Sequence, residues 1–301
     1  MVDDATSLTQ RNARLLRPAT YASVAVAITL IVLKAVVWFM SGSVSLLASL
    51  TDSLMDAGAS LINLLAVGYA LTPADKGHRF GHGKAEALAG LAQSAFITLS
   101  AGLVLWQGLE RLPMPLDGAW YGVGVMLFSI IATLLLLRFQ NRVIRRTGST
   151  AIRADALHYR SDLLMNTSII VALILAWYGI SGADALFGIG IALFIALGAL
   201  KIGRDAVQIL MDHELPEDVR QEALALARAV PGVMGVHDLR TRESGQQWFI
   251  QMHLELPAEL PLGQAHALGE QVRLAICERF PQAEVLVHKD PVRRPETPTA
   301  D

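Results

Sequence analysis

The stretch "SLTDSLMDAGAS", residues 49–60, places two aspartates inside a long apolar run. A second stretch, "ALHYRSDLL" at residues 156–164, adds a histidine and an aspartate. Asp52 with Asp56, and His158 with Asp162, are each spaced i, i+4, which puts both members of a pair on one face of a helix. Ionisable groups are costly inside membrane helices and usually mark an ion or proton pathway. These stretches therefore predict a helical membrane protein with an internal polar site.

The composition supports a membrane domain followed by a soluble one. Of the 301 residues, 53% are hydrophobic and 17% are charged, whereas soluble domains average about 25% charged residues. The apolar runs lie within residues 18–211, and residues 212–291 are much more polar. The net charge of -2 argues against a nucleic-acid partner. The single cysteine excludes both an intrachain disulfide and a cysteine-rich zinc site.

Six apolar runs reach the length of about 20 residues that a membrane helix needs. The predicted spans are residues 18–40, 43–71, 85–110, 118–138, 156–178 and 184–211. Residues 1–17 are expected to form a cytoplasmic N-terminal segment, and residues 292–301 a disordered tail. No small-residue cleavage site follows the first run, which predicts a retained helix rather than a signal peptide.

Positive charge gathers in the loops on one side of the predicted spans. That side carries eleven cationic residues, namely Arg11, Arg14, Arg17, Lys76, Arg79, Lys84, Arg138, Arg142, Arg145, Arg146 and Arg153, whereas the other has only Arg111 near a span end. Because short cytoplasmic loops are enriched in lysine and arginine, both termini and the soluble domain are expected in the cytoplasm. Lys34 lies within the first span and is interpreted as a side chain that reaches back to the membrane interface.

The two pairs on facing helices can enclose one ion. Three carboxylates and one imidazole, from Asp52, Asp56, Asp162 and His158, suit a four-coordinate divalent metal. The nitrogen ligand favours zinc-like ions over manganese or magnesium. The alternative is that these charges pair with one another or with arginine at a helix interface.

A second group of metal-ligand residues lies in the loop "PADKGHRFGHGKAE", residues 73–86. Asp75, His78 and His82 are close enough in sequence to bind zinc, and the glycines let the loop fold around an ion. The alternative is an ordinary solvated polar loop.

The soluble region predicts the order helix, strand, strand, helix, strand. The expected ranges are 216–229, 233–243, 247–256, 263–279 and 284–290, which suggests a ferredoxin-like α+β domain with an open sheet and helices on one face. Its candidate ligands are His237, His253, His266, His288 and Asp290. Ordinary surface histidines are the alternative.

Taken together, "SLTDSLMDAGAS", "DKGHRFGHGKAE", "ALHYRSDLLMN" and "VLVHKDP" resemble the cation diffusion facilitator family, and within it bacterial zinc and iron efflux proteins of the YiiP type. The resemblance covers about residues 18–291. It implies a transport site of Asp52, Asp56, His158 and Asp162, a loop site of Asp75, His78 and His82, and a binuclear cytoplasmic site of His237, His253, His266, His288 and Asp290. It also implies a salt bridge between Lys84 and Asp212, and a homodimer in the bacterial inner membrane.

The function expected from these features is efflux of a divalent cation in exchange for protons. Zn²⁺ is the favoured cargo, with Cd²⁺ and Fe²⁺ as further candidates, and His158 is the group that protons would compete for. The expected partners are metal ions, protons, lipid and a second copy of the chain. Two alternatives are a membrane metal sensor that does not transport and an intramembrane metalloenzyme. No HExxH pattern is present, so no enzyme activity is expected.

Overall fold

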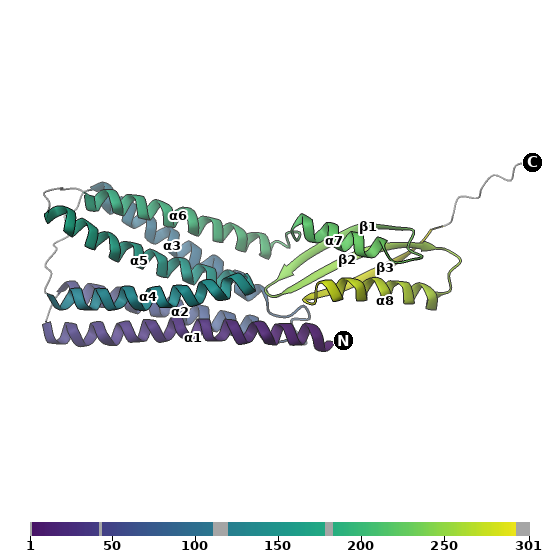
Figure 1. Cartoon of the computed structure of the whole chain (residues 1–301), viewed down its shortest axis with the longest axis horizontal. Helices are drawn as coiled ribbons and strands as arrows, with labels where there is room; N and C mark the ends of the chain where they lie inside the picture. Colours follow the sequence, from purple (N-terminus) through teal and green to yellow (C-terminus); the bar gives the residue numbers. More distant parts are fainter. Residues whose placement is uncertain (1, 42–43, 111–119, 178–182, 293–301) are drawn as a thin grey trace, which may run out of the picture. The chain divides into compact units, whose positions relative to one another are not determined.

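The computed structural model describes residues 2–41, 44–110, 120–177 and 183–292. The chain divides into two compact units, which are considered separately below: residues 13–208, and residues 209–292 together with residues 2–12. Six long helices precede a small α/β unit, as Figure 1 shows. The helices are α1 (Val2–Ser41), α2 (Val44–Ala70), α3 (Lys84–Glu110), α4 (Trp120–Thr147), α5 (Thr150–Trp177) and α6 (Ala183–Leu210).

Helix α5 is the centre of the first unit. Every residue from 154 to 159 is buried, and α5 contributes to three apolar clusters. In these clusters Leu157 packs with Ile195 of α6, Ile152 with Val143 of α4, and Ala156 with Leu136 of α4. Helices α3 and α5 approach each other closely at Gly90, where an added Cβ would lie 2.8 Å from Thr150 Cγ2. Side chains borne by α5 are therefore held from several sides.

The outer surface of this unit is strongly apolar. Large hydrophobic side chains are exposed along α1, α4 and α6, among them Ile28, Val32, Phe128, Ile131, Phe194 and Leu197. Exposed apolar surface on this scale is typical of protein in contact with lipid or a partner. Among the described residues, Ala13–Met40 and Gly124–Thr147 are long and apolar enough to cross a membrane. Six spans therefore stay a prediction.

The helix boundaries differ from the predicted spans at two places. Helix α1 begins at Val2 and continues through Pro18, so the polar N-terminal residues extend the first helix. Helices α4 and α5 meet at residues 148–149, well inside the predicted gap of 139–155. Gly148 ends α4 with a φ of 66°, and its N–H donates to Ile144 O. Ser149 then caps the start of α5, because its Oγ accepts the N–H of Ile152. Hydropathy marks the apolar part of a helix, and the charged turns beyond it are helical too.

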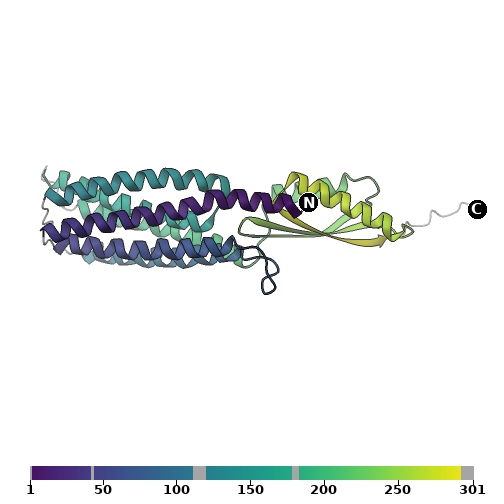
Figure 2. The ribbon, with the colours of Figure 1, turned by 90° about the horizontal axis from the view of Figure 1, so that it is seen from below.

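The second unit has the predicted helix, strand, strand, helix, strand order. Its elements are α7 (Glu217–Arg228), β1 (Gly235–Ser244), β2 (Gln247–Pro257), α8 (Leu262–Arg279) and β3 (Ala283–Val292). The sheet order is β1-β2-β3, with β1 antiparallel and β3 parallel to β2. The parallel pair needs a crossover, and α8 supplies it on one side of the sheet (Figure 2).

Alternation along β2 gives the sheet two different faces. Ile250, Met252 and Leu254 are almost completely buried and pack against α7 and α8. Burial of such side chains contributes about 1.5–3 kcal/mol each. The intervening residues Gln251 and His253 lie on the opposite face, because successive side chains of a strand alternate between faces. That second face is polar and carries the histidines.

Candidate metal sites

The first candidate site lies where α2 and α5 face each other. His158 Nε2 is 2.8 Å from Asp56 Oδ1 and 3.9 Å from Asp162 Oδ2. The three residues offer ligand atoms that all lie within 4.8 Å of one another. Asp52 falls on α2 one turn before Asp56, but its side chain lies outside the described residues. The geometry thus brings together three of the four residues predicted for this site.

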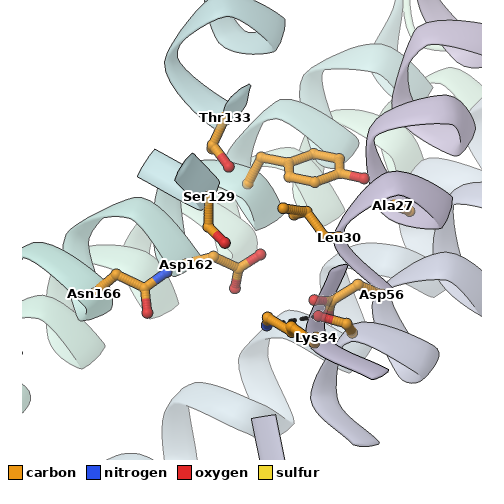
Figure 3. Close-up of a pocket in the computed structure, with 10 residues that line it drawn as sticks. Ala27, Leu30, Lys34, Asp56, Ser129, Thr133, Asp162 and Asn166 are labelled. Carbon is orange, nitrogen blue, oxygen red and sulfur yellow. Dashed lines mark hydrogen bonds between the residues drawn. The ribbon is translucent and has the colours of Figure 1, made fainter. Parts of the chain in front are cut away.

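A cavity opens beside these residues. Figure 3 shows Asp56 and Asp162 pointing into it from opposite sides, with Ser129 and Thr133 of α4 nearby. Lys34 of α1 also lines the cavity, and its ammonium donates to Ser53 Oγ at 2.7 Å. The expectation that Lys34 reaches back to the membrane interface is therefore wrong, because a polar cavity lies within reach of its side chain. The cavity is therefore lined by the carboxylates of Asp56 and Asp162 and by the ammonium group of Lys34.

The second candidate site is the loop between α2 and α3. Asp75 Oδ1 accepts the N–H groups of Gly77 and His78 at 2.7 and 2.6 Å. The N–H of His78 holds the pKa of Asp75 below its usual value. His82 Nε2 lies 3.4 Å from Asp75 Oδ2, and His78 Nδ1 lies 3.5 Å from Asp75 Oδ1. The aspartate therefore organises the loop and keeps both imidazoles close to one carboxylate.

The third candidate site is a row of histidines across the open face of the sheet. His237 pairs in register with His253, and His253 pairs with His288, so one imidazole from each strand stands at the same level. Their ring centroids are 5.2 and 4.6 Å apart along the row. Asp290 lies two residues beyond His288, on the same face.

Asp290 connects the three histidines. Its Oδ2 is 2.8 Å from His253 Nδ1 and 3.3 Å from His237 Nε2, and its Oδ1 is 3.1 Å from His288 Nε2. The hydrogen bond from His253 lowers the pKa of Asp290. Both carboxylate oxygens of Asp290 thus lie beside imidazole nitrogens. Imidazole nitrogen and carboxylate oxygen together are a donor set that zinc-like ions favour.

His266, the remaining predicted ligand, is not part of this group. It lies exposed on α8 and interacts electrostatically with Glu270 one turn along the helix. Lys84 begins α3 in the first unit, and Asp212 lies in the second, where its Oδ1 accepts from Arg242 Nη1 at 3.1 Å. The pairing of Lys84 with Asp212 therefore stays a prediction.

Several polar residues at these sites were missed from the sequence. Glu255 and Asp238 carry oxygens 3.7 Å from His237 Nε2 and His253 Nε2, respectively. Asp238 reaches its place through a bulge in β1, where its φ is 46°. Asp155 of α5 is fully buried. The same cost of a charge in an apolar helix that marked Asp56 also applies to Asp155 and could have identified it.

Comparison with known proteins agrees with this architecture. The family described as "Cation efflux transmembrane domain" matches residues 20–211, and "Cation efflux protein, cytoplasmic domain" matches residues 215–292. A "Cation-efflux pump FieF" from Yersinia pestis (strain Pestoides F) is 52% identical over 281 residues, which is 93% of this chain and 94% of that protein. One from Escherichia fergusonii is 50% identical over 286 residues, covering 94% and 95%.

A solved structure, "MamM-CTD 215-293", is 32% identical, covers 25% of this chain and 98% of that one, and has a TM-score of 0.25. The two matched domains span both compact units, and the pumps align along almost the entire chain. These relatives are transporters, so the expectation that the protein is no enzyme is confirmed by its family. The chain therefore belongs to the cation diffusion facilitator family, in its YiiP-type branch, as a membrane transporter for the efflux of divalent metal cations.

Proposed function

We propose that the protein exports Zn²⁺ from the cytoplasm across the bacterial inner membrane in exchange for protons. The observation that carries this proposal is the convergence of Asp56, His158 and Asp162 from two different helices, beside a cavity that both aspartates line. Asp52 is the fourth ligand, one turn from Asp56 on α2. One nitrogen and three carboxylate oxygens favour Zn²⁺ over Mg²⁺ or Mn²⁺, with Cd²⁺ and Fe²⁺ as further cargo.

Protons drive release because they compete with the metal for the same ligands. Metal binding requires a neutral imidazole and ionised carboxylates, so protonation of His158 and Asp56 weakens the site. Alternating access of the cavity to the two sides of the membrane then couples inward protons to outward metal. Ligands on two separate helices suit this mechanism, because a shift of α2 relative to α5 opens the coordination shell.

The orientation of the protein follows from its charges. We place residues 18–211 in the bilayer as six spans, with residues 1–17 and 212–291 in the cytoplasm. Of the tail expected at residues 292–301, Val292 belongs to β3 instead and the rest lies outside the described residues. The α2–α3 loop and the α4–α5 connection lie at the same end of the helical unit (Figure 1). Arg142, Arg145 and Arg146 are exposed near that end, which supports a cytoplasmic position.

The histidine row is proposed as a cytoplasmic zinc site that stabilises a homodimer. His237, His253 and His288 supply nitrogen, and Asp290 supplies a carboxylate that can bridge two ions. His266 lies apart from this group, so we propose that it joins only when another segment or a second copy of the domain approaches. Lys84 and Asp212 are proposed to couple the two domains. The loop residues Asp75, His78 and His82 are proposed as an accessory site that captures cargo.

Reconstitution in liposomes with an imposed pH gradient tests the proposal. Uptake of Zn²⁺ is expected to follow the gradient in the unmodified protein and to be lost in Asp56→Ala and Asp162→Ala. Asp205→Ala is the matched control, because Asp205 lies on α6 in an ion pair with Arg153, away from the cavity residues. Flux that ignores the gradient, or that survives both substitutions, overturns the proposal.

A further inference from the structure

Asp155 is a completely buried carboxylate that links five helices. Its Oδ2 accepts hydrogen bonds from Ser23 Oγ of α1 at 2.6 Å and from Gln140 Nε2 of α4 at 2.7 Å. Its Oδ1 lies 3.5 Å from both Ser60 Oγ of α2 and Gln93 Nε2 of α3. These four partners are all neutral. The carboxylate is thus surrounded by groups that adjust to its charge without neutralising it.

Each hydroxyl beside Asp155 has a second acceptor within reach. Ser23 Oγ is 3.1 Å from Ala19 O, and Ser60 Oγ is 3.1 Å from Tyr159 Oη. The ionised carboxylate receives the Ser23 proton. A protonated Asp155 donates to Ser23 Oγ instead, and Ser23 then donates to Ala19 O. Rotation of one hydroxyl therefore accommodates an added proton, and every contact is kept.

The amide of Gln140 offers the same choice. Its Nε2 donates to Asp155 and also contacts Ser23 Oγ at 2.9 Å. Its Oε1 is buried and has no hydrogen-bond partner among the described residues. Buried acceptors without a partner are rare. An end-over-end turn of this amide would present Oε1 to a protonated Asp155, so the spare acceptor matches a carboxyl group that gains and loses a proton.

The position of Asp155 couples it to the metal site. Asp155 and His158 are three residues apart on α5, which places them on the same side of the helix. Among the residues whose side chains are described, the titratable groups that interact electrostatically with Asp155 are His158 and Tyr159 of α5, and its hydrogen-bond partners from α1, α2, α3 and α4 are neutral. A buried carboxylate without a cation favours its neutral form, and a divalent ion one turn away favours the ionised form.

We propose that Asp155 is a proton-binding residue of the transport cycle, distinct from the metal ligands. It holds a proton while the metal site is empty and releases it when a divalent cation binds to Asp56, His158 and Asp162. On release the O–H bond of the carboxyl group breaks, and the electron pair stays on Asp155. The proton is taken up by water of the cavity, which Tyr159, the hydrogen-bond neighbour of Ser60, also lines. The proposal rests on the proton antiport proposed above.

Counting the protons released by metal binding tests this assignment. The full-length protein in detergent is titrated with Zn²⁺ in weak buffer near neutral pH, with a pH indicator as the readout. Asp155→Asn is expected to release about one proton fewer per transport site than the unmodified protein, since metal binding displaces protons from linked groups. Asp205→Asn is the matched control and is expected to change nothing. Equal counts for Asp155→Asn and the unmodified protein overturn the proposal.

Infrared difference spectra cover the case in which Asp155→Asn fails to fold. Zn²⁺ is expected to remove the carbonyl band of a protonated carboxylic acid from the spectrum of the unmodified protein. Ser23→Ala is expected to shift the frequency of that band, because Ser23 contacts Asp155 and none of the three described ligands. A band that Ser23→Ala leaves in place belongs to another carboxyl group and overturns the assignment.

The two proposals fail in different ways. If Zn²⁺ flux through the unmodified protein ignores the pH gradient, the antiport function itself is wrong. If the flux follows the gradient while Asp155→Asn releases as many protons as the unmodified protein, only the role of Asp155 is wrong.

Discussion

His253 and His288 stand at the same register on neighbouring parallel strands, with their ring centroids 4.6 Å apart. A parallel pairing of this kind fixes both imidazoles from the backbone, because the positions of the Cβ atoms follow from the pleat. Asp290 reaches this pair from two residues further along β3, where its Oδ2 lies 2.8 Å from His253 Nδ1. The pairing of the strands itself therefore brings these ligand residues together.

Removal of His253 is expected to abolish the stabilisation of the second unit by zinc. An ion present at 100 times its dissociation constant stabilises the folded state by about 2.7 kcal/mol. His253→Ala should lose most of the zinc-induced rise in unfolding temperature, measured on the full chain. Gln251→Ala is the matched control, because Gln251 lies exposed on the same strand and face. An unchanged zinc response in His253→Ala would place the ion elsewhere.

Exchange of His158 for aspartate is expected to change which metal is carried. The replacement turns a mixed nitrogen and oxygen site into an all-oxygen one, which suits Mn²⁺ better than Zn²⁺. Competition flux in liposomes should show a lower ratio of Zn²⁺ to Mn²⁺ transport. His213→Asp makes the same chemical change at an exposed residue outside the site and should leave the ratio unaltered. A retained preference for Zn²⁺ in His158→Asp would mean that the other ligands determine selectivity.

The close contact of Gly90 with Thr150 predicts a pair of compensating substitutions. A Cβ at Gly90 would lie 2.8 Å from Thr150 Cγ2. Overpacking costs about 1–3 kcal/mol, which exceeds the gain of about 1 kcal/mol from alanine in a helix. Gly90→Ala should therefore lower the unfolding temperature, and adding Thr150→Ser should restore part of it. Gly102→Ala, on the same helix with no atom within 4 Å, should cause no loss.

The carboxylate of the cytoplasmic site should titrate at a lower pH than an ordinary aspartate. The pKa of Asp290 is lowered by its hydrogen bond with His253, whereas an aspartate in the unfolded chain titrates near pH ~3.9. The contribution of this carboxylate to stability is therefore fully present above about pH 4 and lost as the pH falls through the lower folded value. The titration of the Asp290 carboxyl carbon, followed by NMR on the metal-free protein, should therefore have its midpoint below that of an unfolded aspartate. A midpoint at or above the unfolded value would contradict the hydrogen bond with His253.

The sequence predicted the helices and strands better than it predicted which residues contact one another in the folded chain. The apolar runs located α1–α6, and alternation in "WFIQMHLEL" located β2. The turn at Gly148 and Ser149 was missed because the charged residues around it interrupt the apolar pattern but not the helix. The order of helices and strands in the second unit follows from local patterns, which need no knowledge of the partner strands.

The histidine row could not be predicted from the residues alone. That His237, His253 and His288 share one register depends on the pairing of strands, which a single sequence does not encode locally. The position of Asp238 depends on a bulge, which inserts a residue without a compositional signal. Asp155 is different, because a lone carboxylate between alanines in an apolar helix was visible in the sequence. Its five-helix environment required the packed structure.

The crossover through α8 also determines when the histidine row can exist during folding. The β1–β2 hairpin closes a short segment of chain, whereas the pairing of β3 with β2 must close the longer segment that contains α8. We therefore expect His288 and Asp290 to join His237 and His253 in the last strand pairing. An ion bound there would hold the domain against unfolding and leave its folding rate almost unchanged. The bound ion would then slow unfolding once the domain has assembled, and the lifetime of the folded domain would depend on the metal supply of the cell.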